Sequence, residues 1–142
     1  MKTCSLLRFF QLFWSFFIGI GALWGCVLMF FMPEFLVNGS TSLLVYMQVL
    51  PWPEVFFQSF TFPAICLFCA NGLTNFIAIV LIFRRSKYGP LAGMLCGIVL
   101  MLWICVQFVI FPRNFLSITY FIFGALQAIN GFAWYRVKRA RA

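Results

Sequence analysis

The most polar cluster inside an apolar stretch of this chain is Asn71-Gly72-Leu73-Thr74-Asn75. Two carboxamides and a hydroxyl in the middle of an apolar helix could coordinate an ion or hydrogen-bond a polar head group. They can also bond to amides and hydroxyls of neighbouring helices and hold the helices together. We favour the packing interpretation and keep the binding site as the alternative. The candidate polar interior comprises Asn71, Thr74, Asn75, Gln107, Tyr120 and Gln127.

Cys66 and Cys69 form a C-x-x-C motif, a spacing used by thiol oxidoreductases. Four-helix, quinone-linked enzymes of that class relay electrons through further cysteines in a water-exposed loop, whereas the long loop 33–59 contains none. Thiolate chemistry also needs an accessible, electropositive setting. Because nearly all the cysteines lie inside apolar runs, we interpret them as small apolar residues.

Acid–base and metal chemistry lack the residues that they need. The chain has no histidine, and its two acids, Glu34 and Glu54, are separated in sequence, which leaves no acid–base pair and no hard metal site. A small multidrug exporter needs a glutamate inside its first span, and none is present. The glycine–arginine and threonine–serine signatures of fluoride channels are also missing. We expect no enzymatic activity, no cofactor and no metal; an uncharged, amide-lined pore stays an alternative.

The composition predicts a membrane protein. Of 142 residues, 65% are hydrophobic and 8% charged, and the mean hydropathy is +1.06, whereas soluble domains average about 25% charged residues. A hydrocarbon core of about 30 Å needs roughly 20 apolar residues in a helix. The single transmembrane domain 1–142 holds four such stretches, at about 9–32, 60–83, 89–111 and 115–135. The first is too long for a signal peptide and is expected to be retained.

The basic residues lie almost entirely on one side of the predicted membrane. Two precede the first span, three fill the connection between the second and third spans, and four follow the last, so nine of the ten share one side. The opposite side carries Arg113, Glu34 and Glu54. Because cytoplasmic loops are enriched in Lys and Arg, we expect both termini in the cytoplasm and loop 33–59 outside. The basic residues then meet anionic lipid head groups, and we expect no nucleic-acid partner.

Loop 33–59 has features beyond those of a simple linker. Turn-forming residues at Asn38-Gly39-Ser40-Thr41-Ser42 precede an apolar stretch, and Pro51-Trp52-Pro53 cannot continue a regular helix. The pattern predicts an interfacial helix near 43–49, followed by a Pro-Trp-Pro turn at head-group level. A re-entrant segment is the alternative.

Each predicted span has one face of small or polar residues at helical spacing. The faces consist of Gln11, Ser15, Gly19, Ala22, Cys26 and Met29 in the first span; Ala64, Asn71, Asn75 and Ala78 in the second; Gly89, Gly93, Gly97 and Gln107 in the third; and Ser117, Tyr120, Gly124, Ala128 and Gly131 in the fourth, with Gln127 at its edge. Such faces allow close helix approach in lipid. A further pair, Gly21 and Gly25, lies off the face of the first span and could form a dimer seam. The partner would be a second copy of the chain, in a homo-oligomer, or another membrane protein.

Several short motifs occur in a characteristic order. They are Gly21-Ala22-Leu23-x-Gly25 before Pro33, Phe60-Thr61-Phe62-Pro63 before an Arg-Arg turn, Gly93-x-x-x-Gly97 before Trp103-Ile104-x-x-Gln107, and Tyr120-Phe121-Ile122-x-Gly124. With them, residues 17–131 resemble a family of small four-helix bacterial inner-membrane proteins, a domain of unknown function. The chain departs from that pattern after Pro63, where a glycine is expected. The resemblance implies a four-helix fold in the plasma (inner) membrane, and it implies no activity or site residues.

The sequence thus predicts an all-α membrane fold, an antiparallel four-helix transmembrane bundle with both termini inside. The leading functional hypothesis is a non-enzymatic membrane component that acts through lipid or protein contacts. The alternative is a small pore or carrier for a neutral or weakly polar solute, with Asn71, Asn75, Gln107 and Gln127 along its path.

Overall fold

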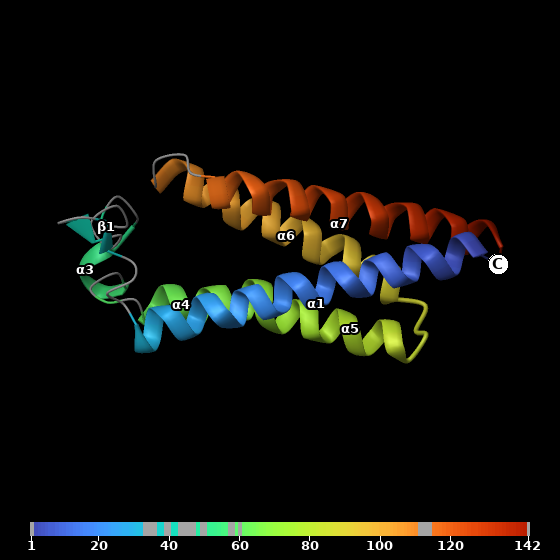
Figure 1. The fold of residues 1–142 in the computed structure, drawn as a ribbon, viewed down its shortest axis with the longest axis horizontal. Coiled ribbons are helices and arrows are strands. Elements are labelled where there is room, and N and C mark those ends of the chain that lie inside the picture. The colour runs from blue at the N-terminus through green and yellow to red at the C-terminus, as the bar shows by residue number, and fades with distance from the viewer. Residues whose placement is uncertain are drawn as a thin grey trace.

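Four long helices make up most of the structure (Figure 1). α1 is Lys2–Phe31, α6 is Gly89–Ile110 and α7 is Phe115–Ala140. The second long helix has three parts: α4 (Thr61–Leu67), the π-helical segment η2 (Phe68–Leu73) and α5 (Thr74–Phe83). The computed structural model describes residues 2–32, 37–38, 41–42, 48, 51–56, 59, 61–110 and 115–141. The prediction of a helical fold built on four long apolar helices is confirmed.

Each of the four helices is long and apolar enough to cross a membrane. The shortest, α6, has 22 residues and is about 33 Å long at 1.5 Å per residue, close to the thickness of a hydrocarbon core. α1 and α7 extend beyond the apolar stretches that the sequence marked, by beginning at Lys2 and ending at Ala140. Lys and Arg are good helix formers, so these helices continue where the hydropathy falls.

The helices pack in two pairs, which contact each other between α1 and α7 and between α5 and α6. α6 and α7 lie side by side, while α1 lies against α4, η2 and α5 and also meets α7 (Figure 1). The beginning of α1 meets the end of α7, where the indole N–H of Trp134 donates a hydrogen bond to the sulfur of Cys4. The end of α1 meets the beginning of α4, where the Cys26 thiol donates a hydrogen bond to the carbonyl of Ala64. Both chain ends and the α5–α6 connection therefore lie at one end of the molecule, opposite α3 (Figure 1).

The side chains are arranged inside out relative to a water-soluble protein. Large apolar side chains cover the outside; Val109 is 83% and Phe115 is 82% exposed. The buried polar residues are Gln11, Ser15, Asn71, Asn75, Ser117 and Gln127. Buried polar groups and broad exposed apolar surfaces are the informative departures from soluble proteins. This surface suits an apolar surrounding.

Short elements lie between α1 and α4. β1 (Val37–Asn38) pairs antiparallel with β2 (Thr41–Ser42) on either side of the predicted turn. α3 is a single turn, Pro53–Phe56, and it begins at a proline because the first helical position needs no N–H donor. Trp52 before it has a φ of 51°, so the chain turns where the Pro-Trp-Pro sequence predicts. The helix predicted near 43–49 lies, apart from Gln48, outside the described residues.

α5 ends in a tight hydrogen-bonded turn at the predicted Arg-Arg position. The N–H of Ser86 donates to the carbonyl of Leu81 at 3.0 Å, and the N–H of Arg85 donates to that of Ile82 at 3.1 Å. Arg85 has a φ of 53°, the left-handed conformation that glycine usually supplies in this Schellman arrangement. The turn reverses the chain toward α6.

Candidate functional site

A hydrogen-bonded group of three side chains lies in the centre of the bundle. Gln127 of α7 donates from Nε2 to Oδ1 of Asn75 on α5 at 2.8 Å and to Oγ of Ser15 on α1 at 3.2 Å. Each of these three side chains is 0% exposed. Gln127, which the sequence placed at the edge of its face, is therefore central, and its amide joins three of the long helices.

A second polar group lies one turn nearer the chain termini. Asn130 donates from Nδ2 to Oε1 of Gln11 at 2.7 Å and to the carbonyl of Leu7 at 2.9 Å. Gln11 is fully buried against Gly93 of α6, where any larger residue would collide with its amide. Sequence reasoning did not single out Asn130, although its signal was the one used for Asn71: an amide inside an apolar run.

Side-chain donors bond to backbone carbonyls in and beside the π-helix. Thr74 donates from Oγ1 to the carbonyl of Ala70 at 2.6 Å, and Asn75 donates from Nδ2 to that of Asn71 at 2.7 Å. The Cys96 thiol of α6 donates to the carbonyl of Thr74 at 3.3 Å. A π-helical turn shifts the backbone hydrogen-bond register, and these three donors satisfy carbonyls beside the shift. Asn75 thus serves both its own helix and α7.

Asn71 differs from its neighbours. Its side chain is 1% exposed, and neither its Nδ2 nor its Oδ1 has a hydrogen-bond partner among the described residues. Two other interior amide atoms share this condition: Nε2 of Gln11 and Oε1 of Gln127. Most buried polar side-chain atoms in proteins are bonded, so an asparagine with both amide atoms unpaired is unusual.

The remaining predicted polar residues do not join this group. Gln107 accepts a hydrogen bond at Oε1 from Ser117 at 3.2 Å, nearer the opposite end of α6 and α7. Tyr120 is half-buried and packs against the apolar cluster of Ile18, Leu100 and Ile104. The six predicted interior residues are therefore distributed along the bundle. One direct side-chain bond joins two of them, between Asn75 and Gln127.

The glycines of the predicted packing faces have different surroundings. A Cβ placed on Gly97 would lie 2.5 Å from the backbone N of Ala128 and 2.6 Å from the carbonyl O of Gly124, so α6 and α7 are in backbone contact there. A Cβ on Gly124 would lie 3.0 Å from the Gly97 carbonyl O. At Gly89 the nearest atom, Cγ1 of Ile82, would be 3.4 Å away. Close approach is thus required at Gly97 and Gly124 and relaxed at Gly89.

Gly21 and Gly25 each face a side chain of their own bundle. A Cβ on Gly21 would lie 2.7 Å from the hydroxyl of Tyr120, and one on Gly25 would lie 2.9 Å from Cδ2 of Leu67. These contacts involve α7 and α4, on two sides of α1. The pair therefore has intramolecular packing roles, and an intermolecular seam at these glycines stays a prediction.

The end of the molecule that holds the termini is tied together by Lys138. Its Nζ donates to the carbonyl of Ser86 at 3.0 Å and lies 5.9 Å from the ring centroid of Trp134. The indole N–H of Trp134 donates in turn to the Cys4 sulfur at 3.2 Å. This chain of contacts links α7, the α5–α6 connection and α1.

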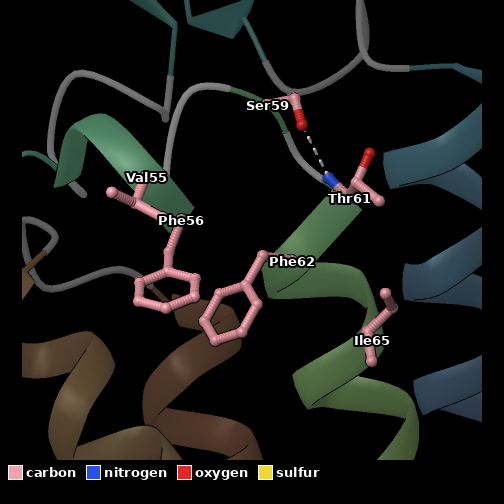
Figure 2. A pocket seen from close by; sticks show the side chains of 6 residues that line it. All are labelled: Val55, Phe56, Ser59, Thr61, Phe62 and Ile65. Carbon is pink, nitrogen blue, oxygen red and sulfur yellow. Dashed lines mark hydrogen bonds between the residues drawn. The ribbon is translucent and has the colours of Figure 1, made fainter. Parts of the chain in front are cut away.

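An open pocket of ≈ 300 Å³ lies at the opposite end, between α3 and α4 (Figure 2). The rings of Phe56 and Phe62 line it, with centroids 4.6 Å apart. Ser59 accepts a hydrogen bond from the N–H of Thr61 at 3.4 Å beside it. The lining carries no charged side chain, and its contacts dock the single turn of α3 onto the bundle.

The two cysteines of the C-x-x-C motif differ in exposure: Cys66 is half-buried, and Cys69 is exposed on the apolar outside. All six cysteines are free thiols. No cluster of three His, Cys, Asp or Glu side chains that could hold a metal ion occurs within the described ranges.

Comparison of the chain with known protein families, curated proteins and solved structures found no match. The resemblance to a four-helix inner-membrane family therefore stays a prediction.

Proposed function

We propose that this chain is a non-enzymatic, multi-pass component of the plasma (inner) membrane, an antiparallel four-helix transmembrane bundle that acts through lipid and protein contacts. The membrane location is supported by four helices of spanning length and by their apolar outer surface. In lipid, helix association depends on close packing and interhelical hydrogen bonds. The Gly97–Gly124 contact and the Gln127 bonds supply both.

The distribution of charge carries the proposal. Both termini and the α5–α6 connection meet at one end (Figure 1), and nine of the chain's ten basic residues belong to these segments. Glu54, the single acidic side chain in the described part, lies in α3 at the other end. No described carboxylate side chain neutralises the basic end, so its natural counterions are the anionic head groups of the cytoplasmic leaflet. Both termini are then cytoplasmic.

A pore or carrier for a neutral solute along Asn71, Asn75, Gln107 and Gln127 has less support. Asn75 and Gln127 bond to each other with 0% exposure. Gln107 bonds to Ser117 in another part of the bundle. The four amides therefore lack a continuous polar path.

Native mass spectrometry from nanodiscs tests the lipid contacts. In discs of equal phosphatidylglycerol and phosphatidylcholine, we expect preferential retention of the anionic lipid. Replacing Arg136, Arg139 and Arg141 with glutamine should reduce that preference severalfold; Lys138 is left intact because it bonds to Ser86. Glu54→Gln, at the opposite end, is the matched control and should change nothing. Equal retention of the two lipids, or an unchanged preference in the triple variant, would contradict the lipid proposal.

Cross-linking in native membranes tests the protein contacts separately. The exposed apolar faces predict a cross-linked product with a second copy or with another membrane protein. A chain that stays monomeric and unlinked, at a reagent concentration that links known membrane dimers, would argue against a protein partner and leave the lipid result standing.

A further inference from the structure

The unpaired carboxamide of Asn71 lies near the middle of the long helix Thr61–Phe83 and inside the bundle. Its side chain is 1% exposed, and neither of its polar side-chain atoms has a partner within the part of the chain that the structure describes. Asn75, one turn away on the same helix, is 0% exposed and uses both of its polar atoms. The same residue type in neighbouring positions is thus fully bonded in one case and wholly unbonded in the other.

Local backbone structure does not require the Asn71 side chain. The carbonyls beside the π-helix are satisfied by Thr74, Asn75 and Cys96. Burial of an amide without hydrogen bonds is unfavourable, and a leucine of similar size would avoid that cost. Residues whose local environment is energetically unfavourable, such as an unpaired buried amide, are concentrated at functional sites in folded proteins. π-Helical turns are also frequent at functional sites.

We infer that Asn71 is the polar contact of a binding site inside the bundle for a small uncharged molecule with a donor and an acceptor side by side, as in a primary amide. An asparagine side chain offers an N–H₂ donor and a carbonyl acceptor in one plane, and such a molecule pairs with both. Glu54, the single described acid, lies at the end of the bundle, so no carboxylate beside Asn71 compensates a cation. The site therefore selects neutral ligands.

Entry of the ligand requires the helices around η2 to separate, because Asn71 is closed off in this structure. Both α1 and α6 contact η2. On the α1 side, a Cβ placed on Gly72 would lie 3.9 Å from Cβ of Ala22, farther than the 3.3 Å to Cδ2 of Phe68 in its own helix. The inference concerns the interior and does not depend on the proposed lipid contacts at the basic end.

Thermal unfolding of the full-length protein in detergent micelles tests this inference. It is followed with a thiol-reactive fluorophore, which labels the exposed thiols in the folded protein and the buried Cys26 and Cys96 on unfolding. Without ligand, Asn71→Leu should raise the Tm by roughly 2–6 °C, since it removes an unpaired buried amide. Asn75→Leu is the matched control and should lower the Tm, because Gln127 loses its partner. An Asn71→Leu variant that unfolds below the wild type by as much as Asn75→Leu would overturn the inference.

Acetamide is the probe for the ligand class, and N,N-dimethylacetamide, which has no N–H donor, is its control. Acetamide should raise the Tm of the wild type more than the control compound does, and this difference should vanish in Asn71→Leu. Asn71→Ala, which removes the amide without adding a branched side chain, carries the same expectation if the leucine does not fit. No difference between the two compounds in the wild type, or an equal difference in the variants, would overturn the site.

Discussion

Polar side chains within the bundle differ sharply in how well their hydrogen-bonding groups are satisfied. Gln127 connects α7 to both α1 and α5, and Asn130 connects α7 to two groups of α1. The side chain of Asn71, also buried, has no hydrogen-bond partner among the residues that the structure describes. Residue type and helical spacing therefore do not determine whether an interior amide holds helices together. The local partners decide it.

The bond between Asn75 and Gln127 should be measurable as a coupling energy. Asn75→Leu and Gln127→Leu should each lower the free energy of unfolding, since each leaves a buried amide atom unpaired. A double-mutant cycle should give a coupling of about 0.6 kcal/mol, the average for interhelical bonds in a membrane protein. Titration with sodium dodecyl sulfate in mixed micelles measures it.

Gln107→Leu provides the control for that cycle. Gln107 bonds to Ser117 in a different part of the bundle, so its effect should add to that of Asn75→Leu. A coupling of zero between Asn75 and Gln127, or an equal coupling of Asn75 to Gln107, would contradict the assignment of the bond.

Which polar residues turn inward could be predicted from amides in apolar runs, and their pairing could not. Asn71, Asn75 and Gln127 are all buried, but Asn75 pairs with Gln127, while the Asn71 side chain pairs with no described residue. Pairing depends on the relative depth and rotation of separate helices, which a single helix pattern does not contain. Asn130 was not predicted because it lies outside the face of small residues that Gly124, Ala128 and Gly131 define on its helix.

At the scale of elements, the small-residue faces have unequal roles. Gly97 allows backbone contact between α6 and α7, whereas Gly93 accommodates the amide of Gln11 and Gly89 has ordinary contacts. A regular G-x-x-x-G-x-x-x-G pattern therefore combines three packing situations. The differences arise because the three glycines face different helices: Gly97 faces α7, Gly93 faces α1 and Gly89 faces α5.

Alanine substitutions along this pattern should have graded effects. Gly97→Ala should destabilise the bundle by about 1–3 kcal/mol, because the added methyl meets backbone atoms that cannot rotate away. Gly89→Ala, the control on the same face, should change stability by no more than about 0.5 kcal/mol. Unfolding in mixed micelles compares them, and equal effects of the two changes would contradict the packing described here.

The end of α5 makes a second prediction at this scale. Arg85 adopts a left-handed conformation that costs most residues about 1 kcal/mol or more. Arg85→Gly should therefore raise the free energy of unfolding by up to about 1 kcal/mol, measured in the same micelle assay. Arg84→Gly, one residue earlier and with a φ of −70°, should give no such gain. Destabilisation by Arg85→Gly would contradict the strain assigned to this turn.

The four long helices and much of their extent could be predicted, since an apolar run of spanning length has few alternatives. The third predicted span, 89–111, corresponds to the helix Gly89–Ile110. The π-helix at Phe68–Leu73 could not be predicted, because α- and π-helical turns use the same apolar residues. Nor does the hydropathy mark where α1 begins and α7 ends, because charged residues continue both helices beyond their apolar stretches.

At the scale of the whole molecule, charge and apolar surface are arranged along one long axis. The termini and the α5–α6 connection carry nearly all the basic residues, and α3 with Glu54 lies at the other end (Figure 1). Apolar side chains cover the length between them. Under the proposed membrane location, this arrangement predicts a single orientation with the basic end in the cytoplasm.

Cysteine labelling in spheroplasts tests this central claim most directly. In a full-length background with the six native cysteines replaced, single cysteines are introduced as Glu54→Cys, Lys87→Cys and Arg141→Cys. A membrane-impermeant maleimide should label Glu54→Cys in intact spheroplasts, and should label the other two only after permeabilisation. Labelling of Arg141→Cys or Lys87→Cys in intact spheroplasts, or protection of Glu54→Cys, would contradict a four-span bundle with both termini in the cytoplasm.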